Sequence, residues 1–233
     1  MYDRSLLTKW YLDCTDSAGN VAIAYWARLA WGKLSIAYSS VMVNRGGATR
    51  TRESLFASPA PVLDGDTLTW SAREIGIGVT MTRRAPAYEA ALLDGVVWRC
   101  EMPSADAAIA IDGEPEIRGN GYAELLQLDG FFGRAPWELP IDELRWGHCG
   151  PRTWIEWRGA HPLTLTLIDG VPADGNASEV DITNARVIRD ATLAETLKIP
   201  GLLLPKRLAA AREEKWIGHA EDGWAVYETV RFA

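Results

Sequence analysis

Cysteine and histidine are too few and too scattered in this sequence to build the usual stabilising or metal-binding devices. Three cysteines, Cys14, Cys100 and Cys149, stand far apart among the 233 residues. An odd number of widely spaced cysteines is not a disulfide framework, and no CxxC or Cys/His spacing of a zinc site occurs. The three histidines show no HxH or HxxxH pattern. We therefore expect no bound metal.

The sequence also lacks a long apolar run, a secretion signal and an excess of positive charge. No apolar run approaches the ~20 residues that cross a bilayer, so we expect no membrane span. The first residues have no basic region followed by an apolar one, which makes the cytoplasm the default location. The formal net charge of −7 argues against nucleic-acid binding, which needs a basic surface. Nothing in these patterns indicates an oligomeric state.

Signatures of nucleotide sites and of serine nucleophiles are absent as well. The motif Gly119-Asn120-Gly121 precedes a strand-like run rather than a helix, so it is not a phosphate loop. No GxSxG motif occurs. We expect no cofactor.

Tryptophan is the abundant aromatic residue, with 11 Trp against 4 Phe. The indole N–H of a buried Trp needs a hydrogen-bond partner. A chain this rich in Trp either packs its sheets with large flat side chains or lines an aromatic cavity.

The periodicity of apolar residues predicts an all-β fold. Alternation with a period of two runs through Val21–Leu29 and Leu34–Val43, and it returns in Leu163–Ile168 and Trp224–Phe232. Many short strands separated by turn signals are typical of sandwiches and barrels. Only Asp190–Lys215 reads as helical, with Asp190 as the candidate N-cap, which predicts one or two short helices near residues 190–215.

Length and composition are compatible with two β units of similar size. We place the N-terminal half at residues 1–115 and the C-terminal half at residues 116–233. No internal sequence repeat supports the division.

Several motifs resemble the carotenoid 1,2-hydratase/AttH-like family, part of the lipocalin-like calycin group that also includes tocopherol cyclase. In chain order they are Trp10-Tyr11-Leu12-Asp13, Gly119-Asn120-Gly121-Tyr122-Ala123-Glu124, Pro136-Trp137, Leu144-Arg145-Trp146-Gly147 and the terminal strand Trp224–Phe232. The resemblance implies two lipocalin-like β-barrel or sandwich halves packed together, with an apolar cavity. It also implies cofactor-free chemistry on isoprenoid- or polyketide-like molecules by hydration, cyclisation or cycloaddition.

Two glutamates are the candidate proton-transfer groups. Glu124 shares an apolar and aromatic face with Tyr122, and Glu228 lies between Val226 and Val230 on the last strand. An apolar surrounding disfavours the charged form of a carboxyl, so its pKa should rise and the group can donate a proton near neutral pH. The alternative is that each Glu pairs with an arginine and stabilises the fold.

His148 is the third catalytic candidate, and Tyr122 would help it to position polar groups of the substrate. His148 follows Trp146-Gly147 at a predicted strand end, where it acts either as a base or as a loop residue with a backbone partner. Cys149 beside it should point to the opposite face of the strand, so the two do not form a catalytic pair.

Aromatic residues are the candidate ligand-binding side chains. Trp faces stabilise developing carbocations by roughly 0.5–2 kcal/mol each, and inter-sheet packing is the alternative role. Tyr25 and Tyr38 face inward in the predicted strand registers, where a phenol can orient a substrate. The full set is Tyr25, Tyr38, Trp137, Trp146, Trp154 and Trp157.

The sequence thus predicts a lyase- or isomerase-type enzyme without cofactor that acts on an apolar small molecule. The alternative is a non-catalytic lipocalin-like carrier of a hydrophobic ligand, because a barrel pocket binds ligands by default. A weaker third reading is a structural β domain whose Trp side chains fill the core.

Overall fold

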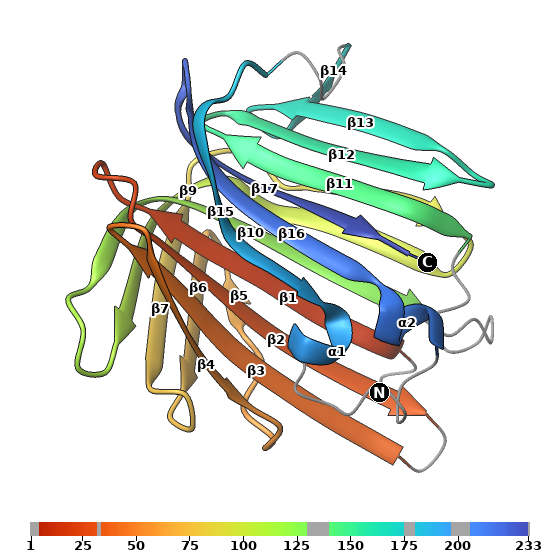
Figure 1. The fold of residues 1–233 in the computed structure, drawn as a ribbon, viewed down its shortest axis with the longest axis horizontal. Helices are drawn as coiled ribbons and strands as arrows, with labels where there is room; N and C mark the ends of the chain where they lie inside the picture. The colour runs from red at the N-terminus through yellow and green to blue at the C-terminus, as the bar shows by residue number, and fades with distance from the viewer. Residues whose placement is uncertain (1–4, 32–33, 130–139, 175–179, 197–205, 233) are drawn as a thin grey trace. The chain divides into compact units, whose positions relative to one another are not determined.

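The computed structural model describes residues 5–31, 34–129, 140–174, 180–196 and 206–232, and most of them form antiparallel strands (Figure 1). The contacts group the chain into two compact units, Met1–Gly133 and Arg134–Ala233, and each is described by itself. No helix among the described residues has the length and apolar character needed to cross a membrane.

The first unit is built around one ten-stranded sheet, in which the strands run in the order β4-β3-β2-β1-β10-β9-β7-β6-β5 and β8 adds to β9. The first strand of this unit, β1, therefore pairs with its last strand, β10, as in an up-and-down barrel that is open between β4 and β5. The strands are β1 (Ser5–Thr15), β2 (Val21–Trp31), β3 (Leu34–Arg45), β4 (Ala48–Ser54), β5 (Val62–Asp64), β6 (Thr67–Ala72), β7 (Ile77–Arg83), β8 (Tyr88–Leu93), β9 (Val96–Ile111) and β10 (Ile117–Asp129).

Alternation along these strands separates an apolar core from a second buried face. On β1, Trp10, Leu12 and Cys14 enter the core cluster of the unit, together with Ala22, Ala24 and Trp26 from β2. Tyr11 and Asp13 therefore lie on the opposite face, and both are buried.

A bulge in β9 decides which of its residues join each face. Met102 pairs with Ala123 of β10, but Cys100 pairs with Glu124, so one extra residue stands between them on β9. Such a bulge exchanges the two faces of the strand beyond it. Met102 consequently lies in the core, whereas Cys100 shares the face of Glu124.

The glycine motif of β10 permits close packing. A Cβ at Gly119 would collide with the carbonyl oxygen of Thr15, and one at Gly121 would collide with the Ala107 side chain. The glycines of this motif therefore allow neighbouring strands to approach closely. This role agrees with the expectation that the motif is not a phosphate loop.

The second unit repeats this topology with a seven-stranded sheet, ordered β14-β13-β12-β11-β17-β16-β15. Its first and last strands, β11 and β17, again pair with each other. The strands are β11 (Ile141–Cys149), β12 (Arg152–Gly159), β13 (Leu163–Ile168), β14 (Val171–Ala173), β15 (Thr183–Thr192), β16 (Arg212–Ala220) and β17 (Gly223–Arg231).

The described helices are two short ones, α1 (Leu193–Thr196) and α2 (Lys206–Ala210), which confirms the prediction of short helices near residues 190–215. The predicted N-cap is wrong, because Asp190 lies in β15 and its carboxylate is bound by Arg212 at 2.6–2.7 Å. The cap is Thr192 instead. Its Oγ1 accepts a hydrogen bond from the Glu195 N–H at 3.2 Å, and Glu195 accepts one from the Thr192 N–H at 2.8 Å, which is a capping box.

The all-β class is thus confirmed, as two antiparallel sheets. The predicted division between residues 115 and 116 falls in the turn between β9 and β10, which pair in the same sheet. The division into two barrel-like halves, 1–115 and 116–233, stays a prediction.

Candidate functional site

Two Tyr-x-acid motifs lie side by side on the second buried face of the first unit. Tyr11 donates its hydroxyl hydrogen bond to Asp13 Oδ2 at 2.9 Å, and Tyr122 donates to Glu124 Oε2 at 2.9 Å. Because β1 and β10 are antiparallel, Tyr11 pairs with Glu124 and Asp13 pairs with Tyr122. In this cluster of four side chains, each carboxyl accepts a hydrogen bond from the tyrosine of its own strand. Each carboxyl also lies beside the tyrosine of the neighbouring strand.

Glu124 receives a second hydrogen bond from β9. The indole N–H of Trp98 donates to the same oxygen, Oε2, at 2.7 Å. Trp98 reaches this face because the β9 bulge lies between it and the core residue Met102. Glu124 is only 4% exposed, so donors such as Tyr122 and Trp98 replace water and fix the orientation of its carboxyl.

The cluster continues onto β2 and β3 through the cross-strand register. Tyr25 pairs with Tyr11, and their rings meet edge-on with centroids 5.0 Å apart. The ammonium of Lys9 lies 5.3 Å from the centroid of the Tyr25 ring. Tyr38 lies on the same face, two residues from Ser40, the β3 partner of Tyr25. Four of the predicted site residues, Tyr25, Tyr38, Tyr122 and Glu124, therefore share one face of one sheet.

Tyr122 is held as a protonated hydrogen-bond donor. Burial raises its pKa well above the ordinary value, and the neighbouring Cys100 and the negative charge of Glu124 raise it further. Its phenol therefore keeps its proton at physiological pH and donates it to the carboxyl oxygen.

Glu228, the other predicted carboxyl, lies in the second unit and takes part in a buried ion network. Lys215 of β16 contacts Glu228, and its Nζ lies 2.5 Å from Glu213 Oε1. Burial by itself raises the pKa of Glu213, but the charge and hydrogen bond of Lys215 and the charge of Arg189 outweigh it and lower the pKa to about 2. The partner of Glu228 is thus a lysine, whereas the sequence suggested an arginine.

His148 shares one face of the second sheet with Trp146, and their rings lie 6.0 Å apart. His148 is fully buried, between its register partners Thr153 and Val226. Cys149 points to the other face, where its Sγ donates to the Gly223 carbonyl at 3.5 Å, so the predicted separation of His148 from Cys149 is confirmed.

The predicted tryptophans occupy both faces of the second sheet. By register, Trp157 lies on the face of Trp146, and Trp154 lies on the face of Cys149. Trp146, Trp154 and Glu228 are among the residues that line a groove of about 470 Å³. Trp137 lies outside the described residues.

Sequence reasoning missed three members of the first-unit cluster, namely Tyr11, Asp13 and Trp98. The signal for the first two was the repetition of Tyr-x-acid in β1 and β10, which period two places on one face. Trp98 had no such signal, because only the bulge brings it to that face.

No group of three or more His, Cys, Asp or Glu side chains in the described part of the chain could hold a metal ion. The cluster around Glu124 contains a fixed carboxyl, a second carboxyl on the neighbouring strand and four phenols.

The fold and this cluster define an all-β protein of two antiparallel sheets with a buried carboxyl–tyrosine face. By sequence, the chain matches no protein-family profile and no curated protein. By structure it is similar to an AttH-like protein from Nitrosomonas europaea, with a TM-score of 0.55 and 10% identity over 99% of this chain and 93% of that one. It is also similar to kievitone hydratase from Nectria haematococca, with a TM-score of 0.48 and 10% identity over 98% of this chain and 89% of that one. The resemblance predicted from the motifs is confirmed at the level of the fold.

Proposed function

We propose that this protein is a cofactor-independent enzyme that hydrates, cyclises or isomerises an apolar isoprenoid- or polyketide-like molecule by proton transfer. The observation that carries the proposal is the buried carboxyl of Glu124, whose Oε2 accepts hydrogen bonds from Tyr122 and Trp98. Donors from two strands hold the group in one direction, which is what a general acid or base requires. The motif resemblance to carotenoid hydratases supports the same class of reaction.

Hydration needs a proton donor for the alkene and a proton acceptor for the attacking water. We assign the first role to Glu124. We assign the second role to Asp13, which lies diagonal to Glu124 across the β1–β10 pair. Diagonal neighbours in a sheet lie about 7–8 Å apart, so the two carboxyls belong to one cluster.

All protons and bonds of this hydration step are accounted for. The C=C bond of the substrate takes the proton of Glu124 at one carbon and the water oxygen at the other. Asp13 takes the proton that the water loses. Transfer of that proton back to Glu124 restores both groups, and Tyr122 and Tyr11 keep the carboxyls oriented throughout.

The proposal is tested by incubating the purified protein in D₂O with a library of isoprenoid and polyketide-like alkenes. We expect at least one product that carries solvent deuterium on carbon, with an added OD group if the reaction is hydration. Mass spectrometry with H₂¹⁸O identifies the source of the oxygen. If ligands bind tightly but none gains deuterium, the protein is the carrier of the alternative reading, and the enzyme proposal fails.

A further inference from the structure

One face of the second sheet combines an aromatic row with rows of charge, and we call it the arginine face. The aromatic row runs through Trp216, Tyr227, Gly147 and Trp154 across β16, β17, β11 and β12. The two charged rows beside it contain Glu214, Arg145 and Glu156, followed by Arg212, Arg231, Glu143 and Arg158. The aromatic side chains of one row thus lie next to the arginines of the neighbouring rows.

Gly147 makes the aromatic row flat at its centre. A side chain there would collide with the ring of Trp154 and with the Cβ of Tyr227. The indole of Trp154 therefore lies across the backbone of β11, where another residue would stand. On the far side, Trp216 and Tyr227 stack with an interplanar angle of 7° and centroids 6.0 Å apart.

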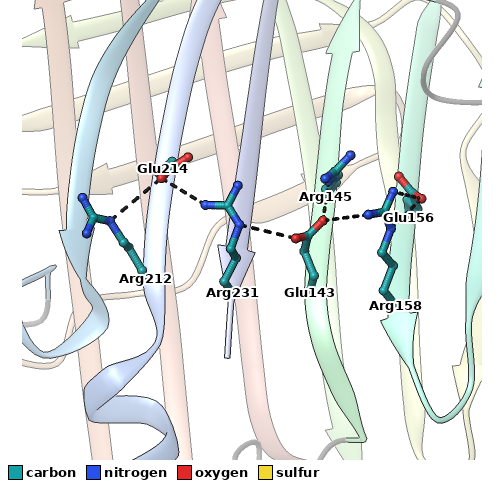
Figure 2. A network of polar contacts seen from close by, with 7 residues as sticks. All are labelled: Glu143, Arg145, Glu156, Arg158, Arg212, Glu214 and Arg231. Atoms are coloured by element: carbon teal, nitrogen blue, oxygen red, sulfur yellow. Dashed lines mark hydrogen bonds and ion pairs between the residues drawn. The ribbon is translucent and has the colours of Figure 1, made fainter. Parts of the chain in front are cut away.

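The charged rows form a nearly continuous network of ion pairs, shown in Figure 2. Arg231 joins Glu214 at 3.0 Å to Glu143 at 3.4 Å, and Arg158 joins Glu143 at 3.6 Å to Glu156 at 3.0 Å. Among the network residues drawn there, Glu143 contacts three arginines and Glu214 contacts two. Glu156 accepts two hydrogen bonds from Arg158.

Arg145 differs from the other arginines of this network. Its Nε lies 2.5 Å from Glu143 Oε1, and Figure 2 shows this as its single ion pair. Arg231, Arg212 and Arg158 each contact two carboxylates of the described residues. The side chain of Arg145 is 40% exposed, and its terminal nitrogens can donate to a ligand without breaking the Nε contact.

Arg145 and Trp154 line the same groove. The groove has a volume of about 470 Å³ and is walled by Glu156, Arg158, Tyr227 and, from the segment before β15, Ile182. This volume lies within the range of about 300–1,000 Å³ for small-molecule sites. An aromatic wall beside a guanidinium is a combination that recognises a flat ring carrying a negative charge.

We propose that this groove binds a small planar organic anion of the aromatic carboxylate class. The ring lies against Trp154 and Tyr227, and the carboxylate accepts hydrogen bonds from the terminal nitrogens of Arg145. Glu156, already paired with Arg158, sets a limit of one negative charge on the ligand by repelling a dianion. The site lies in the second unit and does not involve Glu124, so it stands apart from the proposed proton-transfer activity.

The test uses the whole protein, with naphthoate as the probe and naphthamide as its neutral analogue of the same shape. Binding is measured by isothermal titration calorimetry. We expect naphthoate to bind and naphthamide to bind at least about tenfold more weakly, because the charge-assisted hydrogen bond is lost. Arg145→Met should weaken naphthoate by a similar factor and leave naphthamide unchanged.

Two further variants distinguish the effect of the Arg145 charge from the effect of the Trp154 ring and from a general loss of stability. Arg212→Met removes an arginine of the same network outside the groove, and it should leave both probes unchanged. Trp154→Phe should weaken both probes alike. Because Glu143 keeps Arg231 and Arg158 as partners, Arg145→Met should unfold at the same temperature as the wild type. No binding of naphthoate, equal binding of the amide, or equal losses in Arg145→Met and Arg212→Met would overturn the proposal.

Discussion

At the scale of single residues, burial decides the chemistry of the three thiols. All three cysteines are free and buried. Burial, which outweighs the other influences, raises the pKa of Cys14 from 9.0 to about 12 and that of Cys149 to about 11. Because the thiolate is the reactive form, Cys14 and Cys149 are inert in the folded protein at neutral pH.

We expect a disulfide reagent such as dithionitrobenzoate to label the native protein only as fast as the protein opens, and to label three thiols at once in denaturant. The same shifts make the protein less stable in alkali. Unfolded thiols ionise near pH 9.0 while the folded ones keep their protons, so the free energy of unfolding falls as the pH rises from about 9 towards 12. Rapid labelling of a thiol in the native state at neutral pH would contradict this account.

Residues whose role follows from strand alternation could be predicted from the sequence, and those that depend on an irregularity could not. Tyr25, Tyr38, Tyr122 and Glu124 share a face because period two runs unbroken through their strands. Trp98 joins them only through a bulge in β9, for which alternation gives no warning. The need of buried indoles for partners was foreseeable, and Trp26 and Trp70 satisfy it with carbonyls of the segment before β5.

At the scale of elements, β16 and β17 are joined by the buried network of Glu213, Lys215 and Glu228. Lys215 is 1% exposed and lies between the two carboxylates. Removing one member of such a network leaves uncompensated charge in the interior, which typically costs about 3–5 kcal/mol. The network therefore holds the two strands in register.

We expect Lys215→Met to lower the free energy of unfolding in urea at neutral pH by about 3–5 kcal/mol. Lys206→Met, at an exposed site on α2, is the matched control and should change it by less than about 0.5 kcal/mol. A loss of the same small size in both variants would show that the network does not stabilise the sheet.

The network should also shape acid unfolding. The pKa of Glu213 is about 2 in the folded protein and 4.5 ordinarily, so its contribution is complete above pH 4.5 and is lost as the pH falls towards 2. In Glu213→Gln this part of the pH dependence should disappear. An acid profile identical to that of the wild type would contradict the assignment.

The element boundaries near the helices show where local propensity fails. Asp190 is a good N-cap by type, but pairing of β15 with β16 places it opposite Glu214 and beside Arg212, which takes its carboxylate. Tertiary pairing therefore extends the strand to Thr192, and the cap moves two residues along the chain.

At the scale of the whole molecule, the repetition lies in topology rather than in sequence. Each sheet is an up-and-down arrangement in which the first strand pairs with the last, β1 with β10 and β11 with β17. Many sequences satisfy such a pattern, because it requires only alternation and turns. The fold class was therefore predictable, whereas the pairing of β1 with β10, more than a hundred residues away in the chain, was not.

The central claim is that Glu124, held by Tyr122 and Trp98, carries the proton that reaches the substrate. The most direct measurement is the rate of solvent deuterium incorporation by Glu124→Gln in D₂O, on the substrate that the alkene library identifies. The control is Glu116→Gln, an exposed carboxyl just before the same strand. We predict that Glu124→Gln loses at least about a hundredfold in rate, with fold and ligand affinity retained, and that Glu116→Gln matches the wild type. Undiminished incorporation by Glu124→Gln would contradict the account.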